Sequence, residues 1–254
     1  MYTGVEPTTH AKKNLKNFHA TLSETFSKKI THVVMNKSKS QLKRTVKLML
    51  ALSKSIPNDG PLVVHEGWVA DSIRKGEMQD ESKYRPNSIP QSAMEKREIS
   101  ETNMFDGYAM YVTKNVKPPP KELKKIITTG GGMFCTLAQM KRQGDDMKKV
   151  AITCDQDVSD LKKDASIFVN GIYTNEFVLS GLIQQEFDEK KYRMKGITVV
   201  LEKKKKVVAS AAASVSSKSS SKKKKAAPKK AAPKKAAPKK AAPKKAAPKK
   251  AAPK

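Results

Sequence analysis

The sequence predicts an α/β fold in which two similar units follow one another and a basic tail comes last. Three observations support this prediction: an aromatic-led amphipathic segment occurs twice, short β-rich runs precede each copy, and a lysine-rich repeat fills the C-terminal end. The first copy is Glu66–Ile73, and the second, Asn175–Leu182, begins 109 positions later. Each is followed by a Lys-Tyr-Arg tripeptide, at 83–85 and at 191–193. The same order of segments in both halves indicates an internal duplication.

Four short runs rich in β-branched residues predict the strands that belong with these helices. In the first half they are Thr31–Met35 and Pro61–Val64, and in the second half Val150–Cys154 and Ser166–Val169. Each half therefore alternates strands with helices, which is typical of an α/β domain.

The most regular helix of the first half is predicted over residues 40–54. Ser40 can cap its start, and a proline follows its end. Arg44 and Lys47, three residues apart, then project together from one face, where by default two cations are simply exposed to solvent. Another face of this helix holds Leu42, Val46, Met49, Leu50 and Ser53. A helix of the second half is predicted over Lys121–Thr129.

These segments divide the chain into four parts. The predicted boundaries are residues 1–86 for the first domain, 87–103 for a linker, 104–202 for the second domain and 203–254 for the tail. The linker region is polar and has prolines at its start, which favours an irregular connection.

The positive charge is concentrated in the tail. The chain carries a formal charge of +28, from 52 Lys and Arg against 24 Asp and Glu. Residues 203–254 hold 20 lysines and no acidic residue, which leaves +8 for residues 1–202. Five AAPKK copies and a final AAPK occupy residues 226–254. Because proline recurs every fifth residue, the lysines repel one another and no large apolar side chain can form a core, we expect this tail to be disordered.

Paired lysines separated by small residues suit a polyanion whose charges recur along a groove. DNA or chromatin is therefore the partner that the tail predicts. The composition resembles the C-terminal tails of linker histones. The alternative is a tail for solubility or nuclear import, for which Lys203–Lys206 and Lys222–Lys225 suffice.

Other classes of protein are disfavoured. The longest apolar run, Leu48–Leu52, is far shorter than the roughly 20 residues of a membrane helix, so no membrane partner is expected. Cys135 and Cys154 stand in no Cys/His cluster, which indicates neither a disulfide framework nor a zinc site. The scattered histidines match no catalytic pattern, and the acidic residues near Asp155 lack the spacing of a calcium loop. We therefore expect a binding protein, with no enzymatic activity and no cofactor.

Several motifs of residues 1–202 resemble those of the BRCT family. Trp68 takes the position of that family's core tryptophan, Phe177 takes it in the second copy, and Gly130–Gly132 matches the family's glycine turn. The other motifs are Tyr2–Val5, Lys43–Lys47, Gly107–Thr113 with Pro118–Pro120, and Ile152–Asp157. Two such copies joined by a linker are similar to a tandem BRCT module.

The resemblance implies a phosphoserine site in the first domain. By position, the phosphate oxygens would accept hydrogen bonds from the Thr3 hydroxyl, the Gly4 amide and the Lys47 ammonium group. Arg44 would hold the residue three positions after the phosphoserine, including a free C-terminal carboxylate. Lys117 and Pro118 would line the pocket for that residue. The alternative for Thr3 and Gly4 is an ordinary turn at the end of a strand.

The function implied by the resemblance is a nuclear, chromatin-associated reader of a C-terminal pSer-x-x-aromatic motif, such as that of a phosphorylated variant core histone. The lysine tail would bind neighbouring DNA. One alternative is an architectural DNA-binding protein similar to a linker histone, in which the BRCT pair docks a partner or dimerises. Another is a detached accessory region of a ligase or polymerase.

Overall fold

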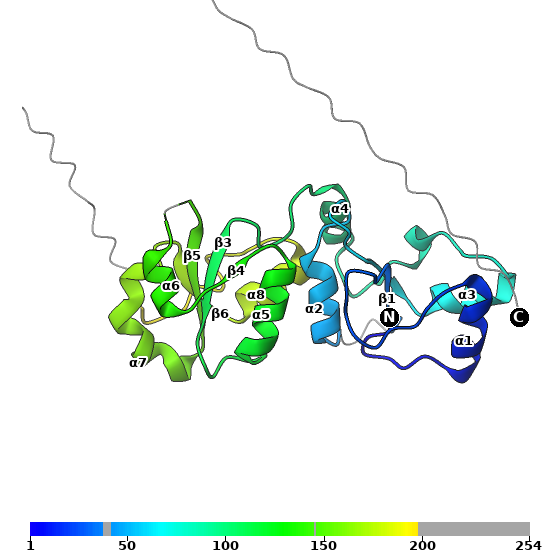
Figure 1. Cartoon of the computed structure of the whole chain (residues 1–254), viewed down its shortest axis with the longest axis horizontal. Coiled ribbons are helices and arrows are strands. Elements are labelled where there is room, and N and C mark those ends of the chain that lie inside the picture. The colour runs from blue at the N-terminus through cyan, green and yellow to red at the C-terminus, as the bar shows by residue number, and fades with distance from the viewer. Residues whose placement is uncertain (38–41, 145, 198–254) are drawn as a thin grey trace, which may run out of the picture. The chain divides into compact units, whose positions relative to one another are not determined.

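The computed structural model describes residues 1–37, 42–144 and 146–197. Two parallel sheets, each flanked by helices, follow one another along this part of the chain (Figure 1). The predicted α/β fold is therefore confirmed. The expected cap at Ser40 and the expected disorder of the tail concern residues outside the described ones. No helix of the described residues is long and apolar enough to cross a membrane.

The sheet of the first half consists of β1 (His32–Met35) and β2 (Leu62–His65), which are parallel. Tyr2 adds a single parallel bridge to Val34 at the free side of β1. The other elements are α1 (Thr9–Asn14), η1 (Leu15–Phe18), α2 (Val46–Ser53), α3 (Gly67–Lys75) and η2 (Glu81–Tyr84).

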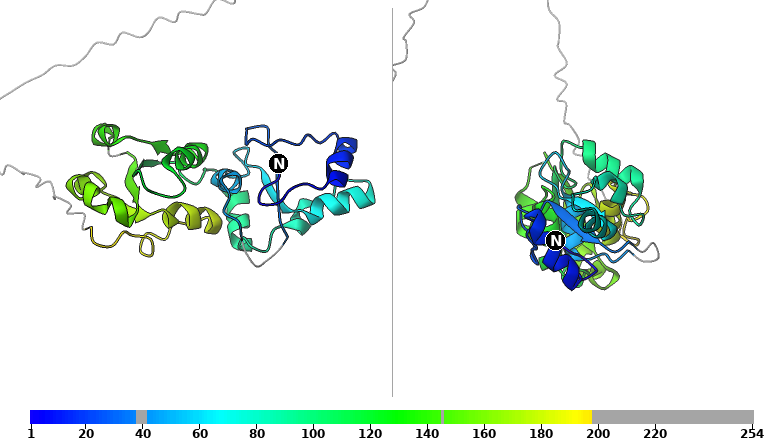
Figure 2. Two further views of the ribbon diagram at one scale, coloured as in Figure 1. Left: turned by 90° about the horizontal axis from the view of Figure 1, so that it is seen from below. Right: turned by 90° about the vertical axis from the view of Figure 1, so that its right-hand side faces the viewer.

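The two faces of this sheet bury different helices. Val34 and Val64 point to the side where α1 and α3 pack against each other, visible side by side in Figures 1 and 2. Trp68 of α3 is buried there, stacks on the His32 ring, and donates its indole N–H to the Gln79 carbonyl at 2.8 Å. Trp68 is thus a core residue with its polar atom satisfied.

The second half has a four-stranded parallel sheet in the order β4-β3-β5-β6. Its strands are β3 (Tyr108–Val112), β4 (Met133–Phe134), β5 (Lys148–Thr153) and β6 (Gly171–Thr174). Its helices are α5 (Pro120–Thr129), α6 (Leu137–Arg142), η3 (Asp155–Asp157), α7 (Val158–Leu161), η4 (Lys162–Ile167) and α8 (Glu176–Gln184).

Residue size alternates along the strands of the second sheet. Ala109 and Ala151 face α6 and α7, whereas Met110 and Ile152 face α5 and α8. Phe177 of α8 is fully buried on the latter side and stacks on Tyr173, so it fills the place that Trp68 fills in the first half. Gly131, in the turn after α5, has φ +85° and no room for a Cβ beside the Asp106 carboxylate.

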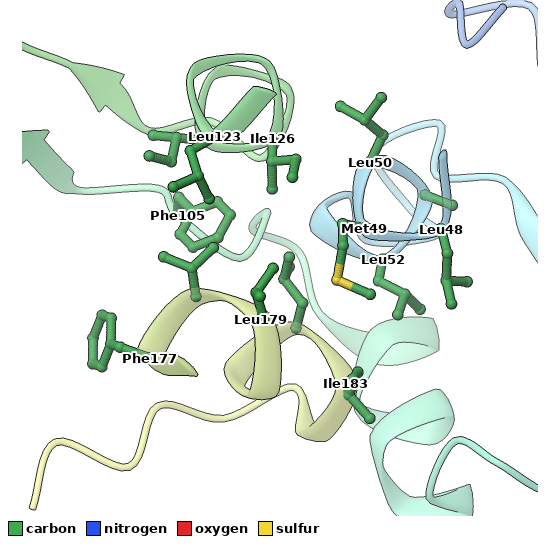
Figure 3. Packing of buried hydrophobic residues seen from close by; sticks show 14 of the residues in the cluster. Leu48, Met49, Leu50, Leu52, Phe105, Leu123, Ile126, Phe177, Leu179 and Ile183 are labelled. Carbon is green, nitrogen blue, oxygen red and sulfur yellow. The ribbon is translucent and has the colours of Figure 1, made fainter. Parts of the chain in front are cut away.

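Helix α2 joins the two halves. Its consecutive residues Leu48–Leu52 are all buried, because one side packs on Val33 and Val63 and the other on α5 and α8. Figure 3 shows side chains of α2, α5 and α8 gathered in one apolar cluster. A helix that is apolar on every side needs such burial, and each fully buried leucine contributes roughly 1.5–3 kcal/mol.

The predicted linker contains a helix, α4 (Gln91–Ile99), that anchors α2. Arg97 of α4 is 1% exposed and donates to the carbonyl oxygens of Ala51, Lys54 and Pro61 at 2.6 to 2.7 Å. Two of these carbonyls belong to the C-terminal end of α2, where helix carbonyls lack partners within the helix. The guanidinium group thus caps the C-terminal end of α2 and fixes this helix to α4.

Two predictions about these elements were wrong. The helix predicted from residue 40 begins only at Val46, since Thr45 is extended and its hydroxyl accepts the Leu48 N–H at 3.2 Å. The strand predicted at Ser166–Val169 is absent, because residues 162–167 form η4 and the strand lies at Gly171–Thr174. A short apolar run fits a helical turn as well as a strand, and here Phe168 is buried beneath the sheet without pairing in it.

Candidate functional site

The predicted donors Thr3 and Gly4 lie next to the start of α2. The Thr3 N–H donates to the Val34 carbonyl at 2.9 Å, which places Thr3 beside the middle of β1. Its side chain is 4% exposed and is hydrogen-bonded to the hydroxyl of Thr45, the capping residue of α2. Thr3 is thus fixed at the helix N-terminus, where the helix dipole favours an anion.

The hydroxyl pair of Thr3 and Thr45 determines which proton is available to a ligand. The Thr45 oxygen already accepts the Leu48 N–H, and each hydroxyl carries one proton. When Thr45 donates its proton to Thr3, the Thr3 proton is left for an incoming oxygen. Sequence reasoning missed Thr45, although a threonine directly before an apolar helix is a common capping signal.

Gly4 has φ +68°, in the left-handed region that favours glycine. A Cβ at this position would lie 3.3 Å from the Lys43 side chain. Within the described residues the Gly4 N–H has no acceptor, so it is a backbone donor beside Thr3.

Lys47 is the second residue of α2 and is half-buried. Burial, and then the charge of Lys47, lowers the pKa of the Met1 amino group, so the ammonium group of Lys47 acts on the N-terminal segment that carries Thr3. Lys47 also lines a cavity of about 470 Å³ together with Tyr2 and Lys12 and the carboxylates of Glu6 and Glu24, and this lining includes neither Thr3 nor Gly4. Thr3, Gly4 and Lys47 thus all lie near the start of one helix.

Arg44 lies before α2 and not on it, so the prediction that it shares a helix face with Lys47 was wrong. Its Nη1 donates to both carboxylate oxygens of Glu176, at 2.8 and 2.7 Å. Glu176 is the first residue of α8 and also accepts the Ser180 hydroxyl at 2.5 Å. Arg44 therefore reaches across to the second half, where a carboxylate already neutralises it.

Lys117 and Pro118 approach the same end of α8. The Lys117 carbonyl accepts the Asn175 side-chain N–H at 2.8 Å, and the Lys117–Pro118 peptide bond is cis. Because Asn175 precedes Glu176, the two predicted parts of the pocket, Arg44 and Lys117–Pro118, both meet the start of α8. No sequence signal joins Asn175 and Glu176 to residues so distant in the chain.

The other candidate groups have structural partners. Burial alone would raise the pKa of Asp157, but hydrogen bonds from Asn115, Thr113 and Cys154 bring that pKa below its ordinary value. Both cysteines are free, and Cys135 is buried. In the part of the chain that the structure describes, no group of three His, Cys, Asp or Glu side chains could hold a metal ion.

Both halves match models of one family. Residues 5–73 match the BRCA1 C Terminus (BRCT) domain, and residues 103–193 match a second model of the BRCT domain. The chain is a tandem BRCT protein. The BRCT domains therefore comprise β1, β2, α1, α2 and α3 in the first half, and the β3–β6 sheet with its helices in the second.

Two known proteins are similar to this chain in sequence. The mediator of DNA damage checkpoint protein 1 of Homo sapiens is 28% identical over 156 residues, which are 58% of this chain and 7% of that protein. PAX-interacting protein 1 of Mus musculus is 23% identical over 211 residues, 76% of this chain and 19% of that protein. The chain thus spans a small part of the length of these relatives.

Solved tandem BRCT structures have the same fold. The BRCT5-BRCT6 domains of S. pombe Brc1 superpose with a TM-score of 0.57 at 22% identity, covering 74% of this chain and 92% of that one. Rtt107p, solved in complex with a phosphorylated histone, superposes with a TM-score of 0.53 at 13% identity, covering 75% and 89%.

Proposed function

We propose that this tandem BRCT protein binds phosphoserine peptides in the DNA damage response. The observation that carries the proposal is the group of donors at the start of α2: the Thr3 hydroxyl, the free Gly4 amide and the Lys47 ammonium group. A phosphate dianion needs several donors at once, and charge-assisted hydrogen bonds are worth roughly 1.5–3 kcal/mol each. The protein acts by binding and not by catalysis.

The proposed ligand has a C-terminal pSer-x-x-aromatic motif, as in a phosphorylated core histone. Arg44 supports this proposal because it directly precedes Thr45, the partner of Thr3, and because its guanidinium group has further N–H groups beyond the Nη1 that binds Glu176. Lys117 and Pro118 would line the pocket of the aromatic residue. Rtt107p, whose fold is similar, was solved with a phosphorylated histone, and the related checkpoint mediator supports a nuclear location.

The decisive experiment is a titration of the full chain with a labelled pSer-x-x-Tyr peptide by fluorescence anisotropy. We expect Lys47→Met to weaken binding ten- to a hundredfold, since one charge-assisted hydrogen bond is lost. Lys75→Met is the matched control, because Lys75 is an equally charged, exposed residue at the end of α3. Equal affinities of wild type and Lys47→Met, or equal affinities for phosphorylated and unphosphorylated peptide, would contradict the proposal.

A second activity, DNA binding by residues 203–254, is supported by their 20 lysines without any acidic residue. If only six phosphates are contacted, affinity should fall by roughly a thousandfold between 50 and 200 mM salt. An architectural role would make this the main function, with the BRCT pair as a docking module. Deleting residues 203–254 would then abolish chromatin retention, while Thr3→Val and Lys47→Met would leave it unchanged.

A further inference from the structure

A groove begins at the Arg44–Glu176 ion pair and continues along α8. Its cavity measures about 890 Å³, within the range of about 300–1,000 Å³ that ligand sites occupy. One wall is the exposed side of α4, with Ser92 and Lys96. The other is α8 together with the segment 186–192 that follows it.

Arg44 links this groove to the proposed phosphate site. Arg44 lines it, and the next residue, Thr45, bonds the Thr3 hydroxyl. The proposed function places the third residue after the phosphoserine at Arg44, and three extended residues span roughly 10 Å. Any residues beyond that one come to the mouth of the groove.

The lining has no net charge. Four basic side chains, Arg44, Lys96, Lys190 and Lys191, stand against four acidic ones, Glu176, Glu186, Asp188 and Glu189. Two of the cations are already paired, Arg44 with Glu176 and Lys96 with Glu186. An occupant is therefore not selected by its charge.

Three side chains with apolar bodies lie among the polar and charged residues of the lining. Ile183, Phe187 and Tyr192 line the groove, and Phe187 and Tyr192 are only partly buried. The Ser92 hydroxyl is exposed on the facing helix and can bond a peptide backbone. This combination suits an extended peptide that carries an apolar side chain.

The Arg44–Glu176 pair also bears on which ligands fit. A terminal carboxylate at Arg44 comes close to the carboxylate of Glu176, and like charges repel. A ligand whose chain continues presents a neutral peptide group at this point and avoids the repulsion.

We propose that the groove between α4 and α8 binds the residues that follow the third position after the phosphoserine. The module thus takes internal phosphoserine segments with a downstream apolar residue, in addition to ligands that end at Arg44. This inference rests on the proposed phosphoserine binding and extends its class of partner.

The test compares phosphopeptides with one common core. One ends at the third residue as an amide, one continues for five residues that include leucine, and one continues for five Gly and Ser residues. We expect the leucine extension to bind the full chain about tenfold more tightly than the short amide, a gain of about 1.4 kcal/mol. The extension of Gly and Ser residues should raise the affinity by less than the leucine extension does.

Two substitutions on α4 locate the effect. Ser92→Trp fills the groove, whereas Gln91→Trp places the same side chain on an exposed neighbour outside the lining. We expect Ser92→Trp to remove the gain from the leucine extension while the short phosphopeptide binds as before. Gln91→Trp should change neither the gain from the leucine extension nor the affinity for the short phosphopeptide. Thermal melting checks that both variants fold.

The outcomes separate this inference from the proposed function. If the leucine extension gives no gain in affinity, or if the gain survives Ser92→Trp, the groove does not bind the downstream residues. The proposed phosphoserine binding then still stands, provided that the short peptide binds only when it is phosphorylated. Loss of phosphate dependence in the short peptide overturns both.

Discussion

Arg44 donates through Nη1 to both oxygens of Glu176, a residue 132 positions later in the chain. The pair joins the segment that precedes α2 to the first residue of α8, and so connects the two BRCT domains at the proposed ligand site. Both side chains are partly exposed, at 42% and 37%. Exposed pairs contribute little to stability, so its larger effect should be on what Arg44 can bind.

Glu176→Gln should therefore change ligand preference more than stability. The glutamine side-chain oxygen can still accept hydrogen bonds from Arg44 and Ser180. The negative charge beside an incoming carboxylate, however, is gone. We expect affinity for a phosphopeptide with a free C-terminal carboxylate to rise about threefold to tenfold, a gain of up to about 1.4 kcal/mol, and that for its C-terminal amide to stay constant. The unfolding free energy should change by less than about 1 kcal/mol.

The control is Glu95→Gln, which removes the same charge from an exposed position of α4 outside the groove. An equal rise for carboxylate and amide peptides in Glu176→Gln would mean that Arg44 does not recognise the chain end.

Thr45→Val should affect stability and binding together. The substitution removes the cap of α2 and the partner of the Thr3 hydroxyl. We expect the unfolding free energy in urea to fall by about 1 kcal/mol. Phosphopeptide affinity should fall as well, because Thr3 loses its fixed orientation.

Thr45→Ser provides the test of this explanation, since it keeps the hydroxyl and should restore both quantities. If Thr45→Ser restores stability but not affinity, the hydroxyl contact between Thr3 and Thr45 does not orient the phosphate donor.

Arg97→Met should be strongly destabilising. The side chain holds three buried carbonyls, and burial lowers its pKa to about 10, so it remains charged at neutral pH. Each carbonyl left without a partner costs about 1–3 kcal/mol, so a loss of at least about 3 kcal/mol is expected in urea unfolding. Glu95→Ala on the exposed side of α4 should stay within about 0.5 kcal/mol of wild type. A similar small change in Arg97→Met would show that α4 does not anchor α2.

Much of the fold could be predicted because it rests on local patterns. The repeated aromatic segments became α3 and α8, and the β-rich runs near His32 and Val150 became β1 and β5. The start of α2 was misplaced because apolar spacing continues upstream of Thr45, whereas the cap and the extended backbone at that residue decide the boundary.

Only part of the candidate site could be predicted from the sequence. Thr3, Gly4 and Lys47 stand in short motifs that a sequence displays directly, and each of them lies near the start of α2. Glu176 and Arg97 belong to no motif. Their roles arise from contacts between residues 132 and 46 positions apart, which depend on how the halves and the linker pack.

His65 should make stability depend on pH. Burial, and then the charge of Lys37, lowers the pKa of His65 below its ordinary value of 6.5. Its Nδ1 accepts the Gly67 N–H at 3.1 Å, so protonation of Nδ1 would place two donors against each other. The unfolded chain takes up this proton more readily than the folded protein. Stability from this residue is therefore fully present above about pH 6.5 and is lost as the pH falls toward the lowered folded value.

The measurement is the unfolding free energy in urea at pH 7.5 and at pH 5.5, for wild type and His65→Gln. Other groups titrate in both proteins, so the difference between their pH dependences isolates His65. We expect wild type to lose more stability on acidification than His65→Gln does. The opposite sign would mean that the folded protein binds the proton more tightly than the unfolded chain, which requires an acceptor near His65 Nδ1 in place of the Gly67 N–H.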